Sequence, residues 1–243
     1  METKNLTKTG LARLIDQTLL APGTTEAQAG QFCAQAKLYG FASVCINPCF
    51  VRKAAEILSG SPVKVCTVID FPLGAGGTEA KLFQADRAIT DGTDELDFVA
   101  DLSLIKAHKW KELTQQLQLI ARSVLEASLF AETEDGAKKE AAVTKLILET
   151  ALLTDEEIVQ GCLCAKEAAF SFVKTSTGFL AKQPNGATLH AVELMRKTVG
   201  EKMGVKASGG IRTTQEALGF LAAGASRIGT SCGIQIAEGL ERS

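Results

Sequence analysis

Short apolar runs alternate with longer amphipathic stretches along most of the chain. The short runs are typical of buried parallel strands, and amphipathic stretches of about ten to fifteen residues are typical of the helices that connect such strands. We expect strands at Arg13–Asp16, Ser43–Ile46, Lys64–Ile69, Glu95–Ala100, Lys145–Leu148, Ser171–Lys174, Gly204–Ala207 and Arg227–Gly229. A chain of 243 residues with 46% apolar content is long enough for one large α/β domain. The pattern therefore predicts a single-domain (β/α)8 TIM barrel over residues 1–243.

The expected helix ends support this division of the chain. Capping-box spacing, in which a hydroxyl and a side chain three residues later satisfy free backbone donors, occurs at Thr25 with Gln28, Thr154 with Glu157, and Thr213 with Glu216. Glycines suited to a left-handed helix end precede four of the expected strands, at Gly40, Gly60, Gly200 and Gly224. The connections from helix to strand should therefore be short.

Composition excludes several classes of partner and cofactor. The net charge is −2, with no run of five basic residues, so we expect no nucleic-acid binding. No apolar stretch approaches the roughly 18 residues of a membrane span, and the first residues are polar, which predicts a cytoplasmic protein. The seven cysteines form no spaced framework and should be reduced thiols. With two histidines, neither near a cluster of carboxylates or cysteines, we expect no metal and no cofactor.

Two lysines close expected strands and are each followed by small residues. Lys174 precedes Thr175-Ser176-Thr177-Gly178, and Lys206 precedes Ala207-Ser208-Gly209-Gly210. A buried ammonium is costly unless it has a function, and small residues leave room for a ligand. Two cations in one pocket lower each other's pKa, and a neutral lysine can form an imine with a carbonyl compound. The pattern favours Schiff-base chemistry over the alternative that both lysines only cap strands and point into solvent.

Other polar residues near strand ends fit the same site, because functional groups of a βα barrel gather where its strands end. The candidates are Asp16, Thr18, Cys45, Asn47 and Asp97. A carboxylate beside two lysines balances their charge and can relay protons, which makes Asp97 the preferred acid/base group. The alternative is that Asp97 is a structural carboxylate of the barrel interior. We assign Asp94 and Glu95 to the preceding loop and the strand start.

Glycine-rich turns follow the seventh and eighth expected strands. Gly209, Gly210, Gly229 and Ser231 lie in these turns, where exposed amides and helix N-termini suit a phosphate group. A phosphorylated substrate is therefore expected. The loop Phe71–Thr78 after the third strand is either a lid or a fixed cap, and the charged segment Glu132–Glu140 is expected to be a solvated loop.

The chain closely resembles the deoxyribose-phosphate aldolase family, which are class I aldolases on a (β/α)8 barrel. The most specific motifs are Phe172–Phe179 and Val205–Thr213, with weaker support from Leu14–Leu20, Val44–Pro48, Phe71–Gly74 and Leu146–Thr150. The resemblance implies that Lys174 is the Schiff-base lysine, Lys206 the lysine that tunes it, and Asp97 the acid/base carboxylate. It places the substrate and its phosphate among Asp16, Thr18, Cys45, Thr175, Gly178, Gly209, Gly210, Gly229 and Ser231.

The resemblance implies reversible cleavage of 2-deoxy-D-ribose 5-phosphate to D-glyceraldehyde 3-phosphate and acetaldehyde, and it makes a homodimer plausible. The chain departs from the family pattern at Gln17, Ala21, Asp70 and Asp101–Ser103, and its only tyrosine is Tyr39, so a tail tyrosine cannot transfer protons. Two alternatives stay open. One is a different Schiff-base aldolase or transaldolase-like barrel acting on another sugar phosphate, and the other is a sugar-phosphate-binding barrel that has lost turnover.

Overall fold

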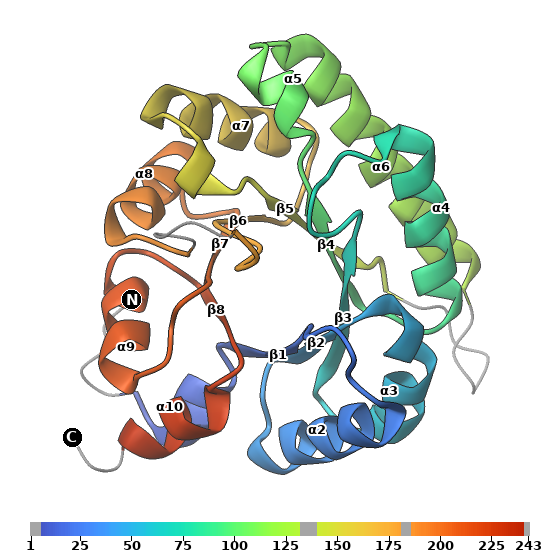
Figure 1. Cartoon of the computed structure of the whole chain (residues 1–243), viewed down its shortest axis with the longest axis vertical. Coiled ribbons are helices and arrows are strands. Elements are labelled where there is room, and N and C mark those ends of the chain that lie inside the picture. The colour runs from blue at the N-terminus through green and yellow to red at the C-terminus, as the bar shows by residue number, and fades with distance from the viewer. Residues whose placement is uncertain (1–5, 132–139, 181–185, 241–243) are drawn as a thin grey trace.

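Eight parallel strands close into one barrel in the computed structural model, which describes residues 6–131, 140–180 and 186–240. Each strand pairs with the next along the chain, and the last pairs with the first (Figure 1). The strands are β1 (Ile15–Leu19), β2 (Ser43–Ile46), β3 (Lys64–Ile69), β4 (Glu95–Val99), β5 (Val143–Ile147), β6 (Phe172–Lys174), β7 (Gly204–Ser208) and β8 (Arg227–Thr230). The predicted TIM barrel is confirmed.

Helices surround the barrel and cover the outer face of its strands (Figure 1). They are α1 (Lys8–Ala12), α2 (Glu26–Tyr39), α3 (Val51–Leu58), α4 (Gly77–Thr90), α5 (Leu102–Lys106), α6 (Trp110–Phe130), α7 (Asp155–Glu167), α8 (Leu189–Val199), α9 (Thr214–Ala222) and α10 (Gly233–Gly239), with short 3₁₀ turns η2 (Pro48–Phe50) and η3 (Thr150–Leu152). Within the described residues, no helix is long and apolar enough to cross a membrane.

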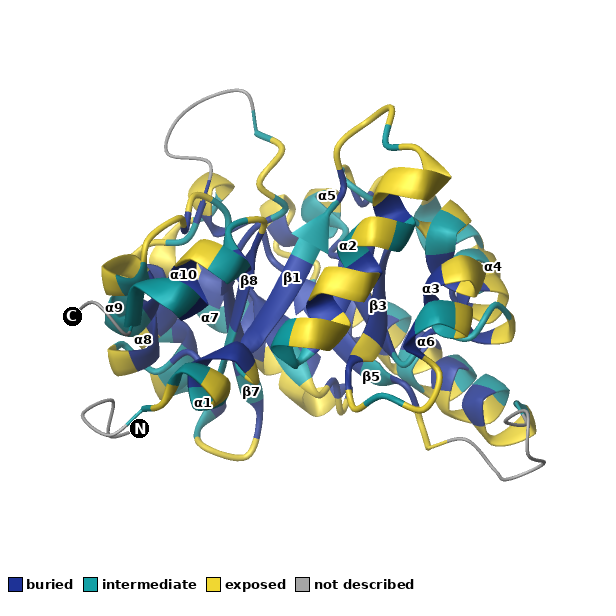
Figure 2. Ribbon diagram, turned by 90° about the horizontal axis from the view of Figure 1, so that it is seen from below, coloured by how far each residue is buried: buried dark blue, intermediate teal, exposed yellow. Residues whose placement is uncertain are grey.

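The apolar core lies between the strands and this ring of helices. Buried aliphatic residues of the strands' outer faces pack against the inner stripes of the helices, as the dark inner layer of Figure 2 shows. A second, smaller apolar cluster lies inside the barrel and consists of Leu20, Cys45, Cys66 and Val68, with Phe71 packed against it. The core therefore fixes the strands from outside and leaves much of the barrel interior for polar side chains.

Local signals in the sequence place the helix ends correctly. The three predicted capping boxes form, at the starts of α2, α7 and α9. The four predicted glycines all have positive φ, at 64°, 69°, 73° and 107° for Gly40, Gly60, Gly200 and Gly224. Side chains disfavour this conformation, so these glycines allow the chain to turn directly from helix into strand.

The first strand lies further along the chain than expected. Helix α1 ends at Ala12, and the amide of Leu14 donates to the carbonyl of Leu11, so the segment assigned to the strand start is a turn. The strand begins at Ile15 and continues to Leu19. Asp16 is consequently an interior residue near the beginning of β1 and does not stand at the strand's end.

The loop after β3 is tied to the body of the barrel. Asp70, at φ 53°, accepts hydrogen bonds from the amide of Gly76 and from the buried ammonium of Lys81, which also donates to the carbonyl of Gly74 at 2.7 Å. A side chain at Gly74 would collide with the carbonyl oxygen of Ala100. These contacts favour a fixed cap over a lid. Of the charged segment assigned to a solvated loop, residues 132–139 lie outside the described residues.

Candidate active site

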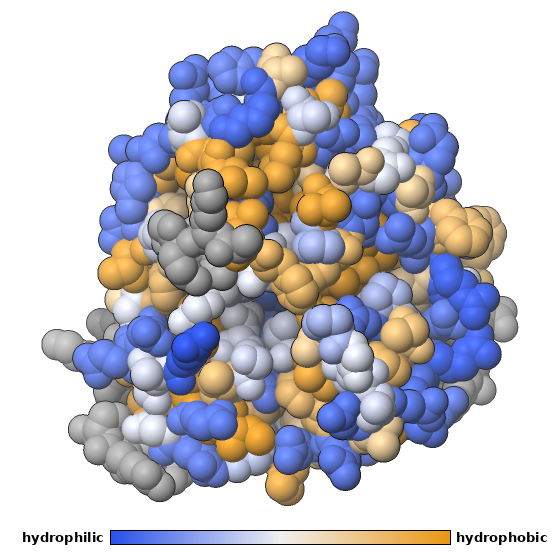
Figure 3. Space-filling model, in the orientation of Figure 1, coloured by the Kyte–Doolittle hydropathy of each residue, from blue (hydrophilic) through white to orange (hydrophobic). Residues whose placement is uncertain are grey.

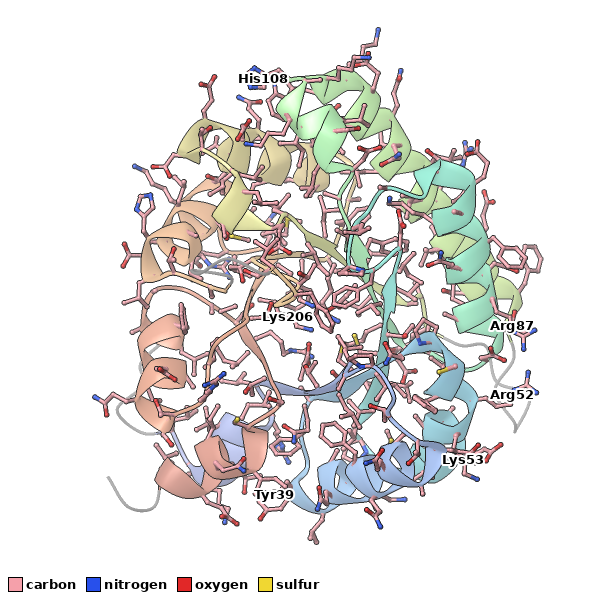
Figure 4. All side chains as sticks on the ribbon, in the orientation of Figure 1. Tyr39, Arg52, Lys53, Arg87, His108 and Lys206 are labelled. Atoms are coloured by element: carbon pink, nitrogen blue, oxygen red, sulfur yellow. The ribbon has the colours of Figure 1, made fainter. Side chains whose placement is uncertain are left out.

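Ionisable side chains fill the middle of the barrel. Successive residues of a strand face opposite sides, so Glu95 and Asp97 both point inward from β4. Asp97 is the register partner of Lys145 on β5, and Lys174 on β6 is the partner of Lys206 on β7. Closure of the barrel brings these neighbouring pairs to a common centre, and Figure 4 shows Lys206 there.

Asp97 is the acceptor that joins the three lysines. Its Oδ2 accepts hydrogen bonds from the Nζ atoms of Lys174 and Lys206, each at 2.8 Å. Its Oδ1 accepts from Nζ of Lys145 at 2.7 Å and from Sγ of Cys66 at 3.3 Å. Each oxygen thus accepts two hydrogen bonds, and the Asp97 side chain is completely buried.

A second layer of charges lies beneath this centre. Asp16 binds Nζ of Lys206 through Oδ2 and a guanidinium nitrogen of Arg227 through Oδ1, both at 2.5 Å. Glu95 binds Nζ of Lys145 at 2.7 Å and lies 3.4 Å from Arg227. Lys145 and Lys206 are thus each held by a second carboxylate besides Asp97.

Opposite charges keep these buried groups ionised. Burial alone would raise the pKa of Asp97, but Lys145, Lys174 and Lys206 lower it well below the usual carboxyl value. Burial likewise opposes a charge on Lys206, yet the attraction of Asp16 and Asp97 raises the pKa of Lys206 above that of free lysine. Asp97 is therefore a carboxylate and Lys206 an ammonium at neutral pH.

A cavity of about 670 Å³ opens above the charged centre, where the strands end. Figure 3 shows a hollow near the middle of this face. Among the described residues it is lined by Thr18, Leu19, Leu20, Ala21, Lys174, Thr177, Gly178, Phe179, Ser208, Gly209, Gly210, Ile211, Arg212, Gly229, Thr230 and Ser231. Of the three lysines bound to Asp97, Lys174 alone reaches this cavity.

One side of the cavity is built from turns with little side-chain bulk. Gly178, Gly209 and Gly210 have φ values of 81°, 87° and 82°, which other residues rarely adopt. A Cβ atom on Gly229 would lie 3.0 Å from Cε of Lys206. Backbone amides and the hydroxyl of Ser231 can therefore approach a ligand closely on this side.

The predicted site residues divide into two groups. Lys174, Thr18, Ser231 and the four predicted glycines line the cavity, whereas Asp97 and Lys206 lie directly beneath it. Asp16, Cys45 and Thr175 are fully buried and are not among the lining residues. Thr175 joins β6 to β7, since its hydroxyl accepts from the amide of Ser208 at 3.1 Å and donates to the carbonyl of Ser208. Any contact of these three with a substrate would need a group that reaches below the cavity floor.

Sequence analysis missed Lys145, Arg227 and the inward direction of Glu95. Each stands at or near the beginning of an expected strand, where a charged residue is usually solvated. The alternation of side chains along a strand could have indicated these directions. Glu95 lies two residues before Asp97, and Lys145 lies two residues before Ile147, so the members of each pair share one face of their strand. Arg212 of the cavity wall was also missed.

The departures from the family pattern have local structural roles. Gln17 accepts a hydrogen bond from the amide of Gly233 at 2.9 Å, and Asp101 caps α5 by accepting from the amide of Ser103 at 3.0 Å. Asp70 holds the loop after β3. Ala21 lines the cavity. None of these residues displaces the lysines or Asp97.

Cys45, Cys66 and Asp97 bring three potential metal ligands within 4.8 Å of one another. Both oxygens of Asp97 already accept hydrogen bonds from ammonium groups. A divalent cation at this place would face the buried positive charges of Lys145 and Lys206, so the donor set suits the lysines better than a metal. The absence of a metal stays a prediction.

Sequence comparison finds close relatives over nearly the whole chain, although no family model matches it. Deoxyribose-phosphate aldolase of Thermoanaerobacter pseudethanolicus is 46% identical over 228 residues, which cover 94% of this chain and 96% of the relative. Deoxyribose-phosphate aldolase of Enterococcus faecalis is 47% identical over 229 residues, again covering 94% and 96%.

Solved structures agree with these relatives. A putative deoxyribose-phosphate aldolase from Coccidioides immitis superposes with a TM-score of 0.85 and 34% identity, covering 96% of this chain and 86% of that one. The deoxyribose phosphate aldolase from Aeropyrum pernix, described as a tetramer of unique structure, has a TM-score of 0.83 and 32% identity over 97% and 92% of the two chains.

The charged centre should dominate stability as well as function. Lys145→Met leaves Glu95 and Asp97 with one cation fewer and should lower the free energy of unfolding by about 3 kcal/mol, measured by urea denaturation. Lys53→Met is the control, because Lys53 is exposed and its one ion pair among the described residues is with Glu56, so its loss should change stability by less than about 0.5 kcal/mol. Equal effects of both substitutions would contradict the role of the buried network.

The stability difference between wild type and Lys145→Met should also depend on pH. The pKa of Asp97 is lowered in the folded protein, so its ion pairs stabilise the fold fully above the ordinary carboxyl value of about 3.9. This contribution is lost as the pH falls through the lower, folded-state value. The difference in free energy of unfolding between wild type and Lys145→Met should be largest at neutral pH and shrink in strong acid. A difference that grows in acid would contradict this role of Asp97.

Proposed function

Because the chain belongs to the deoxyribose-phosphate aldolase family, we propose that it cleaves 2-deoxy-D-ribose 5-phosphate reversibly to D-glyceraldehyde 3-phosphate and acetaldehyde, through an imine on Lys174. The observation that carries this assignment is the access of Lys174 to the cavity, which Lys145 and Lys206 lack. A nucleophile must touch the substrate, and of the three lysines only Lys174 has a path to it.

The reaction needs no cofactor, because the imine itself withdraws electrons. The amine of Lys174 attacks the aldehyde carbon of the open-chain sugar, and loss of water gives an iminium ion. Deprotonation of the C3 hydroxyl then breaks the bond between C2 and C3 and releases D-glyceraldehyde 3-phosphate. Protonation of the remaining enamine and hydrolysis release acetaldehyde and restore Lys174.

The other charges of the barrel interior balance one another. Apart from Lys174, the network of described residues contains three cations, Lys145, Lys206 and Arg227, which face the carboxylates of Asp16, Glu95 and Asp97. Lys174 is the lysine outside this balanced set, and the free amine is the form that attacks a carbonyl.

Asp97 and Lys206 are proposed to manage the protons of these steps. As a carboxylate bonded to the amine of Lys174, Asp97 can accept a proton when the imine forms and return it through water. Lys206 shares the same oxygen of Asp97 and keeps that carboxylate ionised. The roles of Asp97 and Lys206 thus depend on one shared atom, Oδ2.

The glycine-lined side of the cavity is proposed to bind the substrate phosphate. Gly178, Gly209, Gly210, Gly229 and Ser231 surround this side. Amide donors of turns favour anions, and the missing side chains leave space for the phosphate oxygens. Arg212, which is also among the residues that line the cavity, carries a positive charge.

Small sugar phosphates and aldehydes are therefore the proposed substrates, with no nucleic-acid or membrane partner. We further propose that the protein acts in the cytoplasm as a homodimer. The support for a homodimer is the family resemblance.

Lys174 is expected to be the only residue that acetaldehyde modifies when borohydride is added. Attack, water loss and reduction leave an ethyl group on Nζ, which peptide mapping by mass spectrometry locates. Lys174→Ala should abolish this label and lower turnover at least about a thousandfold. An ethyl group on Lys206 would reverse the assignment of the two lysines.

Ser231→Asp should weaken binding of the phosphorylated substrate. The new carboxylate would repel the phosphate, so KM for 2-deoxyribose 5-phosphate should rise at least about tenfold. Unphosphorylated 2-deoxyribose serves as the control substrate, and its KM should rise far less. Equal rises in KM for the two sugars would place the phosphate elsewhere.

Lys206→Leu should move the pH profile of imine formation to higher pH. Without the ammonium of Lys206, less positive charge opposes a proton on Lys174 beside Asp97, so activity at neutral pH should fall steeply and recover in part in alkaline buffer. Lys206→Arg retains the charge and should retain the profile, at reduced turnover. An unshifted profile in Lys206→Leu would mean that Lys206 acts by positioning or proton transfer alone.

A further inference from the structure

Glu149 is a buried glutamate in an unusual backbone conformation next to the cavity. It lies two residues after the end of β5 and has φ 56° and ψ 58°, the left-handed region that residues with side chains rarely adopt. Only 3% of its surface is exposed. A strained backbone and a buried carboxylate at one position indicate that the surrounding contacts hold this residue for a purpose.

The carboxylate of Glu149 is directed at one residue of the cavity wall. Its Oε2 accepts hydrogen bonds from the backbone amide of Thr177, at 3.1 Å, and from the hydroxyl of Thr177. The same hydroxyl oxygen accepts from the amide of Phe179 at 3.1 Å. The other carboxylate oxygen, Oε1, is buried without a hydrogen-bond partner among the described residues. The bonding of the side chain is thus concentrated on Thr177.

Thr177 begins the segment that forms one edge of the cavity. Thr177, Gly178 and Phe179 all line it, and the ring of Phe179 packs edge-on against Phe71 at a centroid distance of 5.0 Å. This segment follows β6, which ends at Lys174. Its conformation therefore decides where the proposed phosphate side of the cavity stands relative to the nucleophile.

Regular strand pairing ends just before this segment. The amide of Thr150 donates to the carbonyl of Thr175 at 2.9 Å, which is the last backbone contact between the β5 and β6 ends in the described residues. Beyond it, Glu149 supplies the bonds that the ladder no longer provides. Phe71 adds a contact to the ring of Phe179 but no hydrogen bond to the backbone of Thr177 or Gly178.

We propose that Glu149 is a positioning residue, which holds the Thr177–Phe179 edge of the cavity in the shape that binds the phosphorylated substrate. The inference rests on the proposed function, since it concerns the same cavity. Glu149 is not among the cavity-lining residues, so it acts through Thr177 and not by touching the substrate.

Two substitutions at Glu149 separate hydrogen bonding from charge. Glu149→Ala removes the acceptor of both Thr177 donors, and KM for 2-deoxyribose 5-phosphate should rise about tenfold. Glu149→Gln keeps an acceptor oxygen of the same reach, so KM should stay within about threefold of wild type. An unchanged KM in folded Glu149→Ala would overturn the proposal, as would a Glu149→Gln variant that is as impaired as Glu149→Ala.

Glu157→Ala is a matched control. Glu157 is also a buried glutamate whose carboxylate accepts from the backbone amide of a threonine, Thr154, at 2.8 Å, but it belongs to α7 and does not approach the cavity. Both alanine variants should lose thermal stability, whereas KM should rise in Glu149→Ala alone. A similar rise in both would show a general effect of destabilisation and overturn the positioning role.

A double-mutant cycle tests whether the effect passes through Thr177. Thr177→Val removes the hydroxyl and should itself raise KM, but in the Glu149→Ala background it should raise KM by a smaller factor than in wild type, because Glu149 is already gone and only the bond from the amide of Phe179 is left to lose. If the two substitutions together raise KM by the product of their separate factors, the effect of Glu149 does not pass through Thr177, which would overturn the proposal. If Glu149→Ala does not fold, the cycle is run with Glu149→Gln, in which Thr177→Val should retain its full effect.

Borohydride trapping with acetaldehyde keeps this inference separable from the proposed function. Acetaldehyde has no phosphate, so the rate at which it labels Lys174 should change less than about twofold in Glu149→Ala. If wild type is not labelled, the imine mechanism fails. If wild type is labelled and the Glu149→Ala label is lost, Glu149 serves the chemical step and the positioning role is wrong.

Discussion

The sharing of one carboxylate by three lysines is the interaction on which the site depends. Asp97 lies at the centre of the barrel and accepts from Lys145, Lys174 and Lys206 through its two oxygens. A buried charge without partners is among the most unfavourable features a fold can contain, so each member of this network requires the others. The same attraction that holds the barrel interior together also fixes the distance between the proposed nucleophile and its proton acceptor.

Access to the cavity gives similar lysines different roles. All three have their Nζ atoms on Asp97, and all three are buried, yet among them only Lys174 lines the space where a substrate can enter. Asp16 and Glu95 fix Lys206 and Lys145 from below. No described carboxylate other than Asp97 forms an ion pair with Lys174 within 4.0 Å. The site thus combines two lysines held as permanent charges with one that can be released for chemistry.

The helices and turns that surround this centre follow from local sequence rules. Some charged residues of the centre do not follow from such rules. Capping boxes and helix-ending glycines placed α2, α7 and α9 and the short turns into β2, β3, β7 and β8. The motifs around Lys174 and Lys206 indicated the chemistry and the glycine-lined side of the cavity. By contrast, Lys145, Glu95 and Arg227 were missed because a charged residue at the edge of an apolar run looks like a strand boundary facing water.

The sequence by itself determined the eight βα units, the lysines and carboxylate that could act together, and the family to which the chain is similar, because periodicity, capping and motifs are properties of neighbouring residues. Only the tertiary structure decided which charges meet. Asp97 and Lys145 are 48 residues apart, and Asp16 and Arg227 are 211 apart. Their pairing depends on strand register and on closure of the barrel, which place alternate side chains inside, and no local pattern contains that information.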